Sequence, residues 1–174
     1  MISKKARKRK KVISFLMRLV TLVKPGSLSH FQIKIIRQLV LIASYRRLIV
    51  NNTTFEKIQL DQLDLYRIKP KKLSDTKKIL FFHGGGFFVG NFKIYRSYVS
   101  FLAEVLGREI IFVEYKLSPE SKYPSQLKDA KKAYSFLVGK EENPNIILAG
   151  DSAGGNLALA LLLAIKRDKS KKPK

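Results

Sequence analysis

The sequence predicts an α/β fold with a mostly parallel sheet and flanking helices. Three short apolar runs have the length and composition of buried strands, at 79–82, 109–115 and 145–149. Each run is followed by a stretch with helical spacing of apolar residues, at 95–106, 125–138 and 156–166. Strands and helices that alternate in this way are typical of a layered architecture in which the strands run parallel.

Glycines and charged residues set the expected ends of these elements. The first strand stops at three consecutive glycines, and the first helix stops at Gly107, since glycine readily takes the left-handed conformation that ends helices. The last helix is apolar on every side from Leu157 to Ile165, so we expect it to be covered all round. We therefore expect the last of the three strands to be interior in a complete fold.

The segments before residue 77 have different patterns. Apolar residues interleaved with lysines and arginines over 31–50 predict an amphipathic helix, because the charges rule out a membrane span. Alternating apolar residues over 58–65 predict a short extended pair or a hairpin. The sequence Lys-Pro-Lys-Lys at 69–72 predicts a turn.

Composition excludes several classes of protein. The chain has 174 residues, of which 45% are hydrophobic, and this is enough to build a core in one domain or in part of a larger one. The absence of cysteine excludes a disulfide framework, a thiolate metal site and a cysteine nucleophile. The two histidines, His30 and His83, make a multi-histidine metal site improbable, so we predict no metal.

Positive charge is concentrated at both ends of the chain, which carries a formal net charge of +22. A run of basic residues begins at Lys4 and leads into an apolar stretch, 12–23, with the spacing of a basic amphipathic helix. Arg18 interrupts the stretch and Lys24-Pro25 comes directly after it, which disfavours a secretory signal, and it is too short to span a bilayer.

Two interpretations of this charge remain open. The segment Lys4–Val23 is a candidate for binding an anionic membrane surface, and a solvated, disordered tail is the alternative. Nucleic acid is disfavoured as a partner, because no recognised binding motif accompanies the basic runs. We expect a cytoplasmic protein, with peripheral membrane attachment as an option.

The first chemical motif is Gly150-Asp151-Ser152-Ala153-Gly154, which lies between a predicted strand and a predicted helix. This pattern fits a nucleophile elbow, in which the serine occupies a strained turn and side chains at the two glycine positions would clash. The helix N-terminus behind the serine would attract developing negative charge. An ordinary glycine-rich turn is the alternative for this motif taken alone.

The second motif is His83-Gly84-Gly85-Gly86, directly after a predicted strand. Consecutive glycines leave backbone N–H groups unshielded, as an oxyanion hole requires. The alternatives are a flexible turn or a phosphate cradle. The chain lacks the Gly-Lys-Ser/Thr of a Walker loop and a GxGxxG sequence that opens a helix.

Together these motifs resemble those of the hormone-sensitive-lipase group of α/β-hydrolases. HGGGF is similar to the group's oxyanion motif, GDSAGGNLA to its nucleophile motif, and EYKLSPESKYPSQLKDA to the stretch between them. The resemblance covers roughly residues 65–166, and the earlier segments resemble the group's amino-terminal cap helices. We therefore divide the chain into a basic segment with cap helices, 1–55, and a partial hydrolase core, 56–174.

The resemblance implies a carboxylic ester hydrolase (esterase or lipase) that acts on a small ester or lipid through an acyl-serine, without metal or cofactor. Ser152 would be the nucleophile. The resemblance places the oxyanion hole at Gly84, Gly85, Gly86 and Ala153, where Gly84 shapes the loop and the other three donate N–H groups. His83, Asp151 and Glu120 would be structural supports, as would the neighbouring motif residues Tyr115, Pro119, Pro124 and Asp129.

The chain departs from the group after the nucleophile. The expected order is Ser, then Asp or Glu, then His, yet the residues after Ser152 contain the single acid Asp168 and no histidine. We disfavour His30 as a substitute base. The leading hypothesis is an inactive amino-terminal portion of an esterase, truncated after the nucleophile helix. The alternatives are a non-catalytic binding or scaffold protein and a cationic membrane-surface protein with a vestigial hydrolase core.

Overall fold

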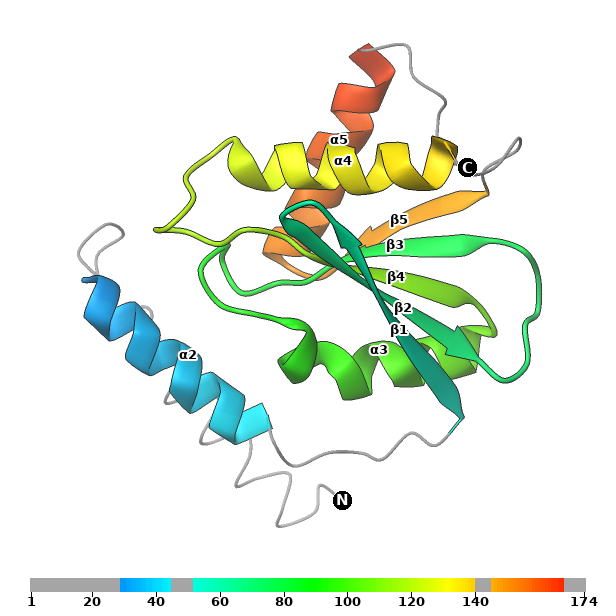
Figure 1. Cartoon of the computed structure of the whole chain (residues 1–174), viewed down its shortest axis with the longest axis horizontal. Helices are drawn as coiled ribbons and strands as arrows, with labels where there is room; N and C mark the ends of the chain where they lie inside the picture. Colours follow the sequence, from blue (N-terminus) through cyan, green and yellow to red (C-terminus); the bar gives the residue numbers. More distant parts are fainter. Residues whose placement is uncertain (1–28, 45–51, 140–144, 168–174) are drawn as a thin grey trace, which may run out of the picture. The chain divides into compact units, whose positions relative to one another are not determined.

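A computed structural model describes residues 29–44, 52–139 and 145–167 (Figure 1). The chain divides into two compact units, residues 1–35 and 36–174. Helix α2, His30–Ser44, matches the start of the predicted helix over 31–50, whose last residues lie outside the described ranges. The predicted helix over 12–23 also lies outside them. Among the described helices, none combines the length and the apolar character needed to cross a membrane.

The second unit is built on a five-stranded mixed sheet in the order β1-β2-β4-β3-β5. The strands are β1 Thr53–Leu60, β2 Leu63–Pro70, β3 Lys78–Phe82, β4 Glu109–Glu114 and β5 Ile146–Gly150. Strands β3, β4 and β5 run parallel to one another, whereas β1 and β2 add an antiparallel hairpin next to β4. The predicted α/β fold and the predicted hairpin are therefore confirmed.

The turn predicted at 69–72 is partly wrong, because Lys69 and Pro70 still belong to β2. Pro70 pairs with Thr53 at the end of the hairpin. The amide of Lys71 then donates to the carbonyl oxygen of Asn52 at 2.9 Å. This hydrogen bond extends the hairpin past the proline, and the chain bends at Lys71 and Lys72, the second half of the predicted turn.

Helices cover both faces of the sheet (Figure 1). Helix α3, Phe92–Leu106, packs on one face, and α4, Ser125–Gly139, and α5, Ala153–Arg167, contribute to the core on the other. Alternate residues of each parallel strand belong to different cores: Phe81 lies in the α3 core, and Leu80 and Phe82 lie in the α4–α5 core. Burial on both faces explains why these strands are continuous apolar runs in the sequence.

Two helices begin three residues before the predicted start. The side chain of Asn91 caps α3 by accepting from the amide of Ile94 at 3.0 Å, so the helix begins at Phe92. It ends as expected at Gly107, where φ is +57°. Helix α5 begins at Ala153, directly after the serine of the nucleophile motif.

Apolar side chains on α5 are exposed in this chain. Leu159 and Leu163 are 64% and 60% exposed. Strand β5 lies at the end of the strand order, so among the described strands it pairs only with β3. A sheet edge next to exposed leucines favours association with other chains.

We expect residues 1–174 to self-associate at micromolar concentration through this surface. The double variant Leu159→Glu/Leu163→Glu should shift the population toward monomer without unfolding, because both side chains already face solvent. Sedimentation velocity over a concentration series measures the shift. The control is Leu161→Glu, at a fully buried position of the same helix, which should unfold the chain. A wild-type chain that stays monomeric over the whole series would contradict the prediction.

Candidate active site

Strand pairing brings the two glycine-containing motifs together. Strands β3 and β5 are parallel neighbours, and their last residues, Phe82 and Gly150, are partners in the register. The segments beginning at His83 and at Asp151 therefore leave the sheet side by side, at the carboxyl ends of the strands. In open α/β sheets this is where ligands bind.

The turn at Ser152 has the strained geometry that the motif predicts. Ser152 has a φ of +49°, in the left-handed region that non-glycine residues rarely occupy. A Cβ on Gly154 would lie 2.0 Å from the carbonyl oxygen of Phe82, and a Cβ on Gly150 would lie 2.6 Å from the same oxygen. Both glycines are therefore required by the close approach of β3. The turn places Ser152 directly before the N-terminus of α5.

The loop after β3 leaves backbone amides available. Gly85 and Gly86 have φ values of +109° and +62°, and the carbonyl oxygen of Gly85 accepts from the amides of Phe88 and Val89. Within the described ranges, the amides of Gly85, Gly86 and Ala153 have no acceptor. They are free to donate to a bound group.

Gly84 differs from its neighbours, because its amide is already engaged. It donates to Oδ1 of Asp151 at 2.9 Å. A Cβ on Gly84 would lie 2.3 Å from Oδ2 of the same carboxylate. Gly84 therefore shapes the loop around Asp151, and its N–H is not available to an oxyanion.

His83 is fully buried beneath this loop. Its Nδ1 donates to the carbonyl oxygen of Gly84 at 2.7 Å, and its ring stacks on Tyr115 with centroids 4.2 Å apart. The hydroxyl of Tyr115 donates to the carbonyl oxygen of His83. Burial lowers the pKa of His83, which favours the neutral imidazole. These contacts are those of a residue that holds the loop.

Asp151 connects the two motifs through a residue that sequence reasoning missed. Its Oδ1 accepts from Gly84, and its Oδ2 accepts from the hydroxyl of Tyr95 at 2.8 Å. Tyr95 lies on α3, one turn after Asn91. The sequence contains no motif that marks it, because the contact joins residues 56 positions apart.

Glu120 is held by Arg37, a second residue that the sequence did not indicate. The guanidinium donates to both carboxylate oxygens of Glu120, at 2.8 and 2.9 Å. It also donates to the carbonyl oxygens of Phe88 and Ser118, at 2.7 and 2.8 Å. Arg37 therefore ties the loop after the glycines to the loop after β4. Asp129, from the same motif as Glu120, accepts from the amide of Lys116 at 2.9 Å.

Glu114 is a partly buried acid near the start of α3. Its Oε2 accepts from the amide of Phe92 at 2.8 Å. Burial is the main cause that raises its pKa, to about 7, and the hydrogen bond from Phe92 opposes this shift. Folding therefore favours the protonated form of this carboxyl.

The raised pKa predicts a pH dependence of stability. The folded chain binds more protons than the unfolded chain between the ordinary pKa of 4.5 and about 7, so stability is fully present below this window and is lost as pH rises through it. We expect the free energy of unfolding to fall by about 3 kcal/mol from pH 4 to pH 8 relative to Glu114→Gln. Urea titrations of both chains measure the difference, and a difference that is constant with pH would contradict the prediction.

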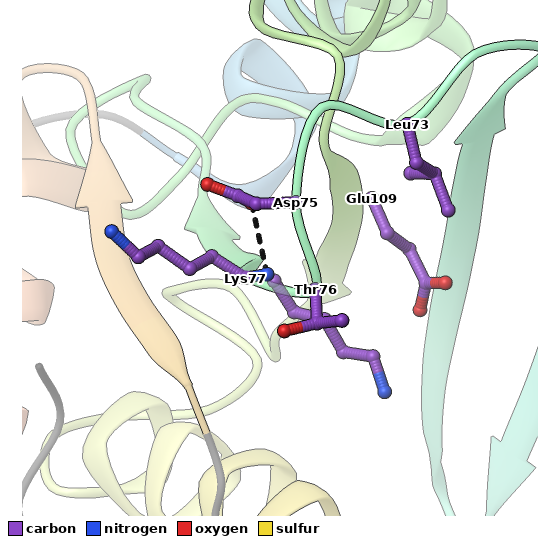
Figure 2. Close-up of a pocket in the computed structure, with 6 residues that line it drawn as sticks. Leu73, Asp75, Thr76, Lys77 and Glu109 are labelled. Atoms are coloured by element: carbon purple, nitrogen blue, oxygen red, sulfur yellow. Dashed lines mark hydrogen bonds between the residues drawn. The ribbon is translucent and has the colours of Figure 1, made fainter.

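The pocket shown in Figure 2 lies elsewhere. It has a volume of about 360 Å³ and is lined by residues at the start of β3 and β4, among them Asp75, Lys77 and Glu109. These strand starts are opposite the strand ends that carry Ser152 and the glycine loop. Asp75 is already paired with Arg108, at 2.7 Å. The pocket is therefore separate from the two motifs.

A family model of the α/β-hydrolase fold matches residues 79–174, which is more than half of the chain. These residues include every residue described above for the site except Arg37 on α2. The chain belongs to the α/β-hydrolase family. Within it, the relatives place the chain with the hormone-sensitive-lipase type, so the resemblance drawn from the motifs is confirmed.

Three relatives illustrate the match. An esterase of Acinetobacter venetianus is 39% identical over 95 residues, which are 54% of this chain and 31% of that protein. The hormone-sensitive lipase of Ictidomys tridecemlineatus is 36% identical over 103 residues, 56% of this chain and 14% of that protein. A crystal structure of an esterase from the bacterial hormone-sensitive lipase family has a TM-score of 0.77 at 25% identity and covers 91% of this chain. The chain spans 54% of that structure.

Proposed function

We propose that this α/β-hydrolase chain carries the nucleophile and oxyanion hole of a carboxylic ester hydrolase. One observation supports this most strongly. Ser152, at a φ of +49°, directly precedes helix α5 and lies beside a glycine loop whose amides at Gly85 and Gly86 have no acceptor within the described ranges. The names of the relatives, which are esterases and lipases, support the same class of reaction.

In the proposed reaction, Oγ of Ser152 forms a bond to the ester carbonyl carbon, and the π electron pair moves onto the carbonyl oxygen. The amides of Gly85, Gly86 and Ala153 donate to this oxyanion. The serine proton passes to a base and then to the leaving alkoxide as the C–O bond breaks. Water attacks the acyl-serine in the same way, which releases the acid and restores the hydroxyl.

In this proposal, none of the described residues serves as the base for these proton transfers, and His30 is disfavoured in that role. His83 is buried and donates through Nδ1 to Gly84, so its role in this proposal is structural. No histidine comes after Ser152 in the sequence. We propose that the base and its acid lie outside these 174 residues, and that the chain by itself is inactive in turnover.

Acylation of Ser152 with an external base tests the proposal. The chain is incubated with an activated acetate ester with and without imidazole, digested and mapped by mass spectrometry. We expect imidazole-dependent acetylation of Ser152 in the folded chain, because imidazole can accept the serine proton. The controls are Ser152→Ala and the urea-unfolded chain, which report background labelling by the reagent.

The outcomes separate the two hypotheses for this site. Labelling of Ser152 that requires both the fold and imidazole supports a hydrolase site. Equal labelling in the folded and unfolded chain, or none in either, would overturn the proposal and favour a non-catalytic binding scaffold that has kept the fold.

A second proposal concerns the segment Lys4–Val23, which lies outside the described residues. We expect it to bind anionic membrane, because each basic residue near such a surface contributes about 1 kcal/mol and an apolar stretch comes after the basic run. Co-sedimentation with vesicles containing phosphatidylserine should retain the chain at low salt, and removal of residues 1–23 should abolish retention. Equal retention by neutral vesicles, or retention on duplex DNA instead, would contradict it.

The division into a basic segment with cap helices, 1–55, and a hydrolase core, 56–174, remains a proposal, as does a cytoplasmic location with peripheral membrane attachment. Strand β1, which begins at Thr53, pairs with β2 throughout its length. A structural boundary placed just before residue 53 would keep this hairpin whole.

A further inference from the structure

We propose that Tyr95 is a positioning residue for the oxyanion hole: its hydroxyl fixes the carboxylate of Asp151, which in turn fixes the start of the glycine loop. This inference rests on the proposed function, because it assigns a role within the same site. The sequence motifs do not include Tyr95, which lies on a different element from both of them.

Three polar groups form a closed set of contacts at this point. The hydroxyl of Tyr95 donates to Oδ2 of Asp151 at 2.8 Å, and the amide of Gly84 donates to Oδ1 at 2.9 Å. The same amide lies 3.1 Å from the oxygen of Tyr95, which accepts from it as well. The carboxylate is therefore held from two directions by groups that also contact each other.

This set joins the two halves of the proposed site. Asp151 is the residue before Ser152, so its backbone belongs to the nucleophile turn. Gly84 is the residue before Gly85, so its backbone sets the direction in which the next two amides point. A fixed carboxylate between them determines how the oxyanion donors are oriented relative to the serine, and such preorganisation is the main source of oxyanion stabilisation.

Within the part of the chain that the structure describes, hydrogen bonds and not a cation hold the carboxylate. Among the described lysines and arginines, none forms an ion pair with Asp151. The carboxylate also has little room to move toward the loop, since a Cβ on Gly84 would already lie 2.3 Å from Oδ2. Loss of the Tyr95 hydroxyl would leave Oδ2 without its side-chain donor.

Tyr95 is itself held in place by rings on its core side. Its ring centroid lies 5.5 Å from that of His83 and 5.9 Å from that of Phe112. Burial, together with the hydrogen bond to Asp151, raises the pKa of Tyr95 well above its usual value. The hydroxyl therefore remains a proton donor throughout the range in which proteins are folded.

The test compares Tyr95→Phe with Tyr98→Phe, a matched control on the same helix whose side chain is 48% exposed. Each variant removes one hydroxyl and keeps the ring. The first measurement is hydrogen exchange of the Gly84 amide by NMR, with both variants made in the Leu159→Glu/Leu163→Glu background that favours the monomer and with the amides of β4 as an internal reference. We expect exchange at Gly84 to rise about tenfold in Tyr95→Phe, the effect of losing about one hydrogen bond, and not in Tyr98→Phe.

The second measurement is the imidazole-dependent acylation of Ser152 as a function of ester concentration. In Tyr95→Phe we expect the maximal rate to fall about tenfold while the half-saturating concentration is unchanged, since the oxyanion forms only in the transition state. Unchanged exchange at Gly84, or faster exchange with an unchanged maximal rate, would overturn the inference. If even the wild-type chain is not acylated, the proposed function fails, and faster exchange at Gly84 would still support the Tyr95 contact.

Discussion

Purified residues 1–174 should hydrolyse an activated phenyl ester at least about a thousandfold more slowly than the Acinetobacter esterase, to which the chain is 39% identical over 95 residues. In the proposed site the amides of Gly85, Gly86 and Ala153 are available as oxyanion donors, so the difference is expected in proton transfer. A serine hydroxyl without a general base is a weak nucleophile. Removal of one triad member leaves only the contribution of binding and the oxyanion hole.

The control for this prediction is Ser152→Ala. In the absence of a base, we expect the variant to retain nearly all of the small rate that the wild type shows, because little of that rate passes through Ser152. Initial rates under identical conditions, corrected for spontaneous hydrolysis, provide the comparison. A wild-type rate that approaches that of the esterase and is lost in Ser152→Ala would show that a base is present, and His30 would be the first residue to replace.

The parts of the fold that the sequence predicted are those that depend on local pattern. The run from Ile79 to Phe82 is apolar at every position because both faces of β3 are buried, and the strand lies where it was expected. The end of α3 at Gly107 depends on the conformational freedom of one residue. The start of α3 at Phe92 could also have been predicted locally, because Asn91 is a good capping residue and its side chain accepts from the amide of Ile94.

The contacts that organise the candidate site depend instead on distant residues. Tyr95 contacts Asp151 because α3 packs on the sheet face opposite α4 and α5. The first turn of α3 lies close to the end of β3. Arg37 reaches Ser118 across 81 positions. Tyrosine and arginine occur on many helices without such roles, so periodicity and motif spacing carry no information about these two. The glycine motifs could be predicted because their backbone requirements are local.

Substitution at Gly154 should strongly destabilise the fold. In Gly154→Ala, the new Cβ would lie 2.0 Å from the carbonyl oxygen of Phe82 and 2.7 Å from that of His83. Both atoms belong to the backbone at the end of β3, which is hydrogen-bonded to β4 and β5 and cannot yield as a flexible side chain would. We expect the free energy of unfolding to fall by at least about 3 kcal/mol.

The matched control is Gly139→Ala, the same substitution at the end of α4. A Cβ there meets no described atom within 4 Å, and alanine is favoured over glycine in helices by roughly 0.5–1 kcal/mol. This variant should therefore be as stable as the wild type or slightly more stable. Urea unfolding at submicromolar concentration, where self-association is suppressed, measures both changes. If Gly154→Ala unfolds at the same urea concentration as Gly139→Ala, α5 can move away from β3 without cost, and the close approach that forces Ser152 into its turn is not a requirement of the fold.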